Sequence, residues 1–306
     1  MSCANPYWLE ASGDRRFFVG CNQCLYCKMQ RRRTWVIRIL HEQLYHDGSC
    51  FITLTYEREP PRGLVKKHLQ NFFKRLRKEI YPRKIKYFAC GEYGEQATKR
   101  SHYHSIILGL SEDEFKCLRM WKEPEWDARQ EKYLYFVDVW KEGITDVGSA
   151  DPDSIRYVAG YIDKKWMSKD EYPVEYGGRI APFQIQSAGI GLSWVNDNVD
   201  VLLRGEPLMY RGKPQPIPKY YMDKLQELSP FFGLTRKVEM AEESKVSQAD
   251  VVLEVDETLG GATFNELTEE ERNKIRGELV KRGRAMQNNL RAQAETHKLK
   301  KIHRRI

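Results

Sequence analysis

The sequence predicts an α+β protein in which helices pack on an antiparallel sheet. Segments rich in β-branched and aromatic residues, typical of strands, recur at 50–56, 84–92, 102–110 and 132–140. Segments with a helical repeat of apolar residues stand among them, at 28–46, 64–80 and 153–167. The short polar connection between 92 and 102 makes those two strands antiparallel neighbours.

The first half of the chain carries the clearest elements. Val36, Leu40 and Leu44 recur every fourth position and predict the helix at 28–46. FITLTY predicts the first strand, which Pro60 and Pro61 end. The helix at 64–80 is amphipathic, with lysines and arginines opposite one apolar stripe: Val65, Leu69, Phe72, Phe73, Leu76 and Ile80.

The second half is harder to assign. Pro152 precedes the helix at 153–167, which carries a stripe of apolar residues: Ile155, Val158, Ile162 and Trp166. LMYRGKPQPIPKYY resembles a hairpin around Arg211-Gly212 followed by an extended proline segment. Thr268 and Glu271 form a capping box before a polar helix.

These elements suggest three consecutive regions. Residues 1–49 hold a cysteine-containing segment and a basic helix, 50–230 the core with its extension, and 231–306 an acidic and then basic tail. We expect the tail to be helical and partly flexible, packed loosely or against a partner. The chain has 306 residues without a long apolar stretch or a signal peptide, so we expect the protein to work in the cytoplasm of the cell that makes it and not in a membrane.

Positive charge points to a polyanionic partner. The net charge is +8, and residues 61–88 contain ten Lys or Arg against one acid. A solvated helix face explains any single basic cluster, whereas two clusters near one site favour a surface that follows a phosphate backbone. The residues predicted to contact DNA are Arg31, Arg32, Arg33, Lys74, Arg75, Arg77 and Lys78.

Two histidines stand one residue apart at the start of the third strand. His102 and His104 point to the same side because side chains alternate along a strand. They are either ordinary histidines or ligands of one divalent metal. Glu92, at the end of the neighbouring strand, can lie beside them, and Glu95 follows it. Such a mixed set suits Mn²⁺ or Mg²⁺ and leaves coordination positions open.

The helix at 153–167 carries two tyrosines four residues apart. Tyr157 and Tyr161 share one face, and Lys164 follows on that face. They are either half-buried structural tyrosines or nucleophiles. Beside a metal and basic flanks, a tyrosine can attack a phosphodiester and hold DNA covalently, while Lys164 stabilises the developing charge.

The order FITLTY, FACGEYGE, HYH and YVAGYIDKK resembles the rolling-circle replication initiators of the HUH endonuclease superfamily. More narrowly, these motifs with FFKRLRK, SAGIGLSW and RGKPQPIPKYY resemble the initiators of Microviridae, in the gokushovirus branch, over residues 1–222. Such proteins nick single-stranded DNA at the phage origin and remain linked to the 5′ phosphate through tyrosine. They leave a 3′ hydroxyl for the host replication machinery, such as its helicase and polymerase, and later rejoin the strand.

The resemblance implies roles for particular residues. His102 and His104 match the metal motif, with Glu92 as the third ligand, and Tyr157, Tyr161 and Lys164 match the catalytic helix. Gly160 stands three residues after Tyr157, where related phage proteins can carry a lysine, so Tyr161 is the better-supported nucleophile.

A run of cysteines precedes the first helix. Cys21, Cys24 and Cys27 have C-x2-C-x2-C spacing, with Cys3 upstream. Four thiolates can hold a structural zinc ion, the spacing also resembles part of an iron–sulfur motif, and reduced cysteines without metal are the third interpretation. The odd total of seven cysteines, without a secretion signal, argues against a disulfide framework.

Two other functions remain open. A transposase or plasmid relaxase of the same superfamily would use the same chemistry. A non-catalytic DNA-binding protein would need only the basic segments, and its tyrosines would be structural.

Overall fold

The computed structural model describes residues 3–10, 16–94, 99–128, 130–161, 178–215, 217–228 and 268–303. By contact, the chain forms two compact units. One combines Met1–Arg31 with Gln226–Ile306, and the other is Arg32–Leu225. The three consecutive regions drawn from the sequence stay a prediction.

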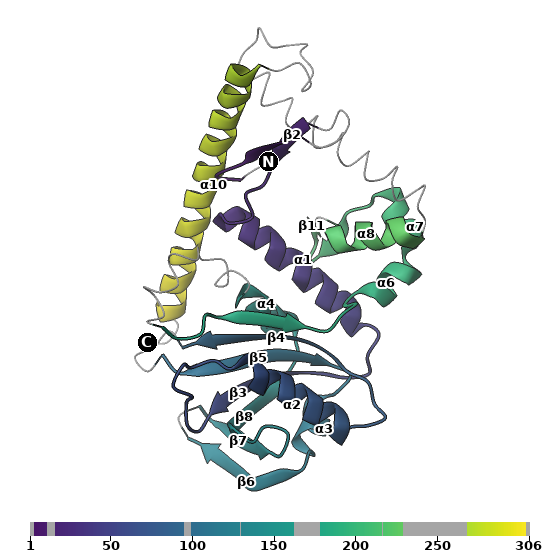
Figure 1. Ribbon diagram of the computed structural model, residues 1–306, viewed down its shortest axis with the longest axis vertical. Helices are drawn as coiled ribbons and strands as arrows, with labels where there is room; N and C mark the ends of the chain where they lie inside the picture. Colours follow the sequence, from purple (N-terminus) through teal and green to yellow (C-terminus); the bar gives the residue numbers. More distant parts are fainter. Residues whose placement is uncertain are drawn as a thin grey trace. The chain divides into compact units, whose positions relative to one another are not determined.

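The larger unit is built on a seven-stranded antiparallel sheet, which confirms the predicted fold class (Figure 1). Its central strand contains the segment FITLTY, which is rich in β-branched and aromatic residues. In spatial order, the strands are β6 (Met120–Asp127), β7 (Lys132–Val137), β8 (Gly143–Ser149), β3 (Ser49–Tyr56), β5 (Ser101–Leu108), β4 (Lys86–Tyr93) and β9 (Phe183–Gln186).

Each face of the sheet is covered by different helices. Leu54 and Tyr103 pack in one core with α2 (Lys66–Glu79) and with Phe115 of α3 (Glu112–Lys116). Phe88 and Ile106 pack in a second core with α1 (Leu25–Gln43) and α4 (Pro152–Gly160). Since successive side chains alternate, His102 and His104 share the α1/α4 face, whereas α2 covers the opposite face.

The catalytic helix predicted at 153–167 is shorter than expected within the described residues. Asp151 caps its start by accepting hydrogen bonds from the amides of Asp153 and Ser154, and α4 ends at Gly160, with Tyr161 as its C-cap. The predicted Ile162 and Trp166 lie outside the described residues.

Several elements were not predicted. β6 is an exposed edge strand that contains Pro124, which the edge position tolerates, and β8 is polar and contains two glycines. The hairpin at Arg211-Gly212 is confirmed, as β10 (Leu208–Tyr210) and β11 (Lys213–Gln215). The extended segment predicted after it is wrong beyond Pro218, because a helix forms there. The remaining helices of this unit are α6 (Leu192–Asp197), α7 (Val199–Arg204) and α8 (Lys219–Leu228).

The smaller unit pairs the two ends of the chain. β1 (Tyr7–Glu10) and β2 (Arg16–Val19) form a hairpin, and the predicted polar helix is α10 (Glu269–His303). The capping box is confirmed, since the Thr268 hydroxyl accepts from the Glu271 amide and the Glu271 carboxylate accepts from the Thr268 amide. None of the described helices is both long enough and apolar enough to cross a lipid bilayer.

The start of α10 is docked rather than loosely packed, which corrects the expectation for this part of the tail. Ile275 and Leu279 are fully buried. Arg276 donates from Nε to the carbonyl of Pro6 at 3.1 Å. Gly283 lies so close to the backbone of Cys3 that a Cβ would come within 2.0 Å of its carbonyl oxygen.

Gly283→Ala should therefore destabilise the smaller unit, by about 1–3 kcal/mol, because the added methyl group meets rigid backbone. The matched control is Gly277→Ala, in the same helix, where an added Cβ would meet nothing within 4 Å. The control should gain about 1 kcal/mol from helix propensity. Calorimetric unfolding of the full chain measures both effects; equal stabilisation by the two substitutions would contradict the tight contact.

Candidate metal and tyrosine site

The pairing of β4 with β5 assembles the predicted triad. Glu92 lies directly opposite His102, and the neighbouring position on that face places Cys90 opposite His104. One carboxylate oxygen of Glu92 is 2.8 Å from Nε2 of His102 and 3.2 Å from Nε2 of His104. The three ligand atoms lie within 4.8 Å of one another. The sequence-based expectation that these three residues meet is therefore correct in geometry.

The contact at Nδ1 of His102 determines whether its Nε2 carries a hydrogen or a lone pair. Nδ1 of His102 lies 3.1 Å from the carbonyl oxygen of Arg100, which can only accept, so Nδ1 carries the hydrogen. A neutral His102 then presents a lone pair on Nε2 to the Glu92 carboxylate. Two electron-rich atoms at that distance require a positive charge between them, either a proton or a metal cation.

His104 provides the deeper ligand. Its side chain is 6% exposed, and Nδ1 is 3.0 Å from the hydroxyl of Thr53. Among the described residues, its Nε2 is buried and makes no hydrogen bond of good geometry. Burial lowers the pKa of His104, so the ring is neutral at neutral pH.

Glu92 supplies the negative charge. Burial opposes ionisation of this carboxyl, but its close contacts with His102, His104 and Tyr161 outweigh burial and hold its pKa well below its usual range. The set is thus two imidazoles and one carboxylate, which fits a divalent cation with open coordination positions. Glu95, the other acid considered from the sequence, lies outside the described residues.

Both predicted tyrosines pack against His104. The ring of Tyr161 stacks on that of His104, with centroids 5.4 Å apart and planes 14° apart. Tyr157 meets the same imidazole edge-on at 5.2 Å and the ring of Tyr161 at 4.9 Å. The three side chains therefore form one aromatic cluster beside Glu92.

The two tyrosines differ in environment. Tyr157 is 48% exposed, whereas Tyr161 is half-buried. Burial, then hydrogen bonding to Tyr157 and the charge of Glu92, raise the pKa of Tyr161 far above its usual value. The Tyr161 hydroxyl is thus the one that reaches the carboxylate of the triad. Lys164, predicted to assist, lies outside the described residues.

Sequence reasoning missed two residues of β3 at this site. Phe51 stacks on His104 at 5.5 Å, and Thr53 stands opposite His104 in the register and contacts its Nδ1. FITLTY was interpreted only as a strand. Its alternation already places Phe51 and Thr53 on one face, but their partner depends on which strand lies alongside.

The predicted DNA-contacting residues lie at separate places. Arg32 donates from Nε to the Arg156 carbonyl of α4 at 3.1 Å, and its guanidinium lies where a side chain at Gly160 would be, 3.1 Å from the Cβ position. Arg33 is exposed. Residue 160 is not a lysine, but the guanidinium of Arg32 in α1 places a cation near that position. Arg31 belongs to the smaller unit.

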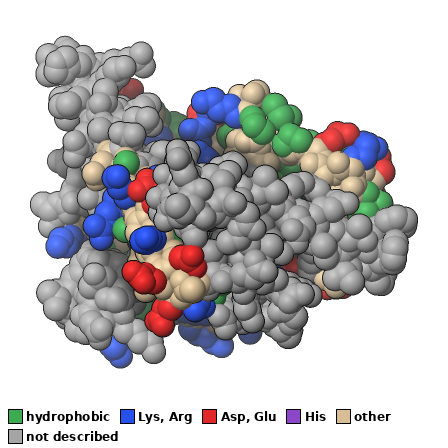
Figure 2. Space-filling model, turned by 90° about the horizontal axis from the view of Figure 1, so that it is seen from above, with side chains coloured by type: hydrophobic (Ala, Val, Ile, Leu, Met, Phe, Trp, Pro, Cys, Tyr) green, Lys and Arg blue, Asp and Glu red, His purple; other side chains and the backbone are tan. Residues whose placement is uncertain are grey.

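The basic residues of α2 lie across the sheet from the triad, so the two basic clusters do not flank one site as expected. Lys74, Arg77 and Lys78 are exposed. Arg75 is half-buried and donates from Nε to the Val139 carbonyl at 2.8 Å, which gives it a structural contact. On the face drawn in Figure 2, the described Lys and Arg side chains stand in small groups beside acidic or apolar ones.

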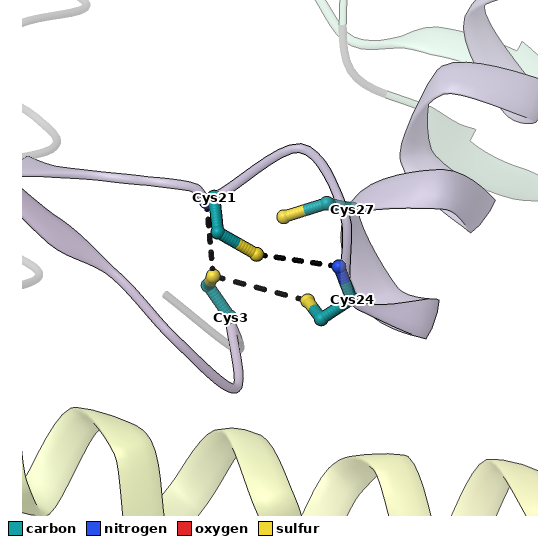
Figure 3. A group of neighbouring side chains, drawn as sticks. All are labelled: Cys3, Cys21, Cys24 and Cys27. Atoms are coloured by element: carbon teal, nitrogen blue, oxygen red, sulfur yellow. Dashed lines mark hydrogen bonds between the residues drawn. The ribbon is translucent and has the colours of Figure 1, made fainter. Parts of the chain in front are cut away.

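The four predicted zinc ligands also come together. The sulfur atoms of Cys3, Cys21, Cys24 and Cys27 all lie within 4.8 Å of one another, in the smaller unit (Figure 3). This cluster is separate from the Glu92 triad, because it belongs to the other compact unit.

Comparison with known proteins gives relatives among phage replication proteins. The family model for replication-associated proteins of the ORF2 type matches residues 49–166, which include the triad and both tyrosines. Replication-associated protein VP4 of Bdellovibrio phage phiMH2K is 29% identical over 68% of this chain and 67% of its own length. Replication-associated protein ORF4 of Chlamydia phage 1 is 27% identical over 69% of this chain and 54% of its own length.

No solved structure matches this chain. The chain spans about half to two thirds of the length of these two curated relatives. The predicted resemblance to phage replication proteins is confirmed at this level, since the chain is similar to replication-associated proteins of two phages.

Proposed function

We propose that this protein is a metal-dependent DNA nicking and joining enzyme of the HUH type that initiates rolling-circle replication of a phage genome. The observation that carries the proposal is the convergence of Glu92, His102 and His104 with the rings of Tyr157 and Tyr161 on one sheet face. The relatives are replication-associated proteins, which favours a replication initiator over a transposase or relaxase.

The substrate is single-stranded DNA at an origin, met in the cytoplasm of the host. The hydroxyl oxygen of Tyr161 forms a bond to the scissile phosphorus as the bond to the 3′ oxygen breaks. The departing oxygen becomes a 3′ hydroxyl by taking up a proton in place of the one the phenol loses. The 5′ phosphate stays on the tyrosine, and the number of phosphoester bonds is unchanged, so no nucleotide cofactor is consumed.

His102, His104 and Glu92 are the residues that would hold a Mg²⁺ or Mn²⁺ ion. When bound, such a cation would draw negative charge from the non-bridging oxygens of the phosphate. The chain's own contribution is orientation. Thr53 and the Arg100 carbonyl hold the Nδ1 sides of the imidazoles, so both Nε2 atoms face Glu92. His104 positions Tyr161 by stacking.

Tyr157 is placed to act as the second nucleophile. It contacts both His104 and Tyr161 and is the more exposed of the two tyrosines. When Tyr161 carries a DNA strand, Tyr157 could attack a second origin phosphate, and the freed 3′ hydroxyl could then displace Tyr161 and rejoin the first strand. Host polymerase and helicase would act on the 3′ hydroxyl between the two events.

Removing the carboxylate charge should weaken metal binding. Glu92→Gln is expected to reduce Mn²⁺ affinity at least tenfold, about 1.4 kcal/mol, because it deletes the anionic ligand and leaves only neutral ones. The matched control is Glu123→Gln, an exposed change on β6. Isothermal titration with Mn²⁺ measures both; an unchanged affinity in Glu92→Gln would exclude this triad as the metal site.

The tyrosines should be unequal. Tyr161→Phe is expected to lower covalent adduct formation to background, because its hydroxyl is the one that reaches Glu92, whereas Tyr157→Phe should keep a first cleavage. The assay is an SDS-resistant protein–DNA adduct on origin single-stranded DNA with Mn²⁺. The reverse order would reassign the first nucleophile. No adduct in folded, metal-loaded wild type would favour the non-catalytic DNA-binding protein.

The exposed cations of α2 should contribute affinity without sequence preference. Replacing Lys74, Arg77 and Lys78 by Gln should weaken binding to unrelated single strands alike, and should lower the salt slope by about 0.7 for each lost phosphate contact. Lys213→Gln removes one exposed charge elsewhere and serves as the control. Fluorescence anisotropy over a salt series measures this, and a loss confined to the origin sequence would contradict it.

A further inference from the structure

The cysteine cluster of the smaller unit has no part in the proposed nicking chemistry. Cys3 precedes β1, Cys21 follows β2, and Cys24 and Cys27 stand at the start of α1. Figure 3 shows the four sulfur atoms turned toward a common centre between these segments. All four cysteines are free, so no disulfide explains why they meet.

The spacing of the sulfur atoms matches one tetrahedral metal ion. A Zn–S bond of about 2.3 Å places the sulfur atoms of a tetrahedral site about 3.8 Å apart. Sγ of Cys24 lies 3.8 Å from Sγ of Cys3, and all four sulfur atoms lie within 4.8 Å of one another. A multi-iron cluster, which places several irons and bridging sulfides among the thiolates, needs a wider cage.

Backbone amides point at the sulfur atoms, as they do around thiolates. The amides of Gln23 and Cys24 donate to Sγ of Cys21 at 3.4 and 3.2 Å. The amides of Asn5 and Cys21 donate to Sγ of Cys3 at 3.4 and 3.2 Å. Such hydrogen bonds stabilise negative charge on sulfur, which a neutral thiol would not require.

The local backbone is shaped for this arrangement. Asn22 has a φ of 60°, the left-handed conformation that asparagine tolerates, and it turns the chain between Cys21 and Cys24. Gly20 lets the backbone approach Sγ of Cys27, since a Cβ there would lie only 3.0 Å from that sulfur. Cys27 itself lies in the first turn of α1.

We propose that Cys3, Cys21, Cys24 and Cys27 form a closed structural Zn²⁺ site that holds the N-terminal hairpin and α10 in one module. Binding replaces the thiol protons, which pass to solvent, and changes no oxidation state. Four protein ligands leave no open position, so this site does no chemistry. It goes beyond the proposed nicking function and does not depend on it.

The link to α10 runs through the residues next to the cluster. Cys3 is the ligand whose backbone Gly283 contacts, and Arg276 binds the carbonyl of Pro6. The guanidinium of Arg272 lies 5.6 Å from the ring centroid of Trp8 in β1. Loss of the metal frees the segment that carries Cys3, so it should also release the start of α10.

The first experiment measures zinc in the full chain with His102 and His104 both changed to Ala, so that the triad cannot contribute. After incubation with Zn²⁺ and removal of excess, mass spectrometry of the metal should find one zinc per chain. Cys24→Ser and Cys27→Ser should lose it, and Cys117→Ser, an exposed cysteine outside the cluster, should keep it. Absence of zinc, or iron with visible absorption, would overturn the proposal.

A second measurement needs no substitution in the cysteine cluster. Substituting Co²⁺ in the same protein should give the strong visible absorption of a tetrahedral thiolate site. Chelation of the zinc should speed amide hydrogen exchange in β1, β2 and the first turns of α10, while β3 and β5 stay protected. Unchanged exchange in α10 after complete metal removal would refute the module, and a Co²⁺ spectrum typical of oxygen or nitrogen ligands would refute the ligands.

Discussion

The antiparallel register between β4 and β5 is the constraint on which the proposed active site depends. It places Glu92 across from His102, and the strand repeat of two then brings His104 to the same carboxylate. A slip by one residue would move both histidines to the α2 face and bring Tyr103 to theirs. The buried apolar residues on both faces therefore fix the register, because a slip by one residue would move them out of the cores in which they pack.

Packing on the α1/α4 face brings the tyrosines to that triad. Ile155 and Val158 of α4 are fully buried in the core that also contains Ile106 of β5. Anchoring α4 by these apolar residues directs Tyr157 and Tyr161 at His104. Arg32 then secures the end of α4 through the Arg156 carbonyl. Ordinary hydrophobic burial thus positions the groups whose chemistry is polar.

The triad and the exposed cations of α2 lie on opposite faces of the sheet. The exposed cations of α2 stand on the face away from the triad, so in the proposed reaction they would attract DNA without lying beside the scissile phosphate. In the smaller unit, α10 near the end of the chain packs against the segment that carries Cys3 near its start. Under the proposed function, a protein that holds a strand through two reactions would gain from binding surfaces that are independent of its reactive groups.

Much of the site followed from the sequence because it depends on local geometry. The shared face of His102 and His104 results from strand alternation, and Glu92 is near because a short connection joins neighbouring strands. The hairpin at Arg211-Gly212 and the capping box at Thr268 were likewise readable from adjacent residues. The predicted triad, tyrosine pair and cysteine group each came together as expected.

Tertiary structure alone decided the contacts between distant segments. Phe51 and Thr53 joined the site because β3 pairs with β5, Arg75 became a structural residue because α2 lies against Val139, and α10 docked because Gly283 fits the backbone of Cys3. Sequence periodicity indicates which side of an element is apolar, but it does not say which other element will cover that side. That choice is made by the joint packing of the whole chain, so neither the position of α2 opposite the triad nor the end of α4 could be read from residues 64–80 or 153–167 by themselves.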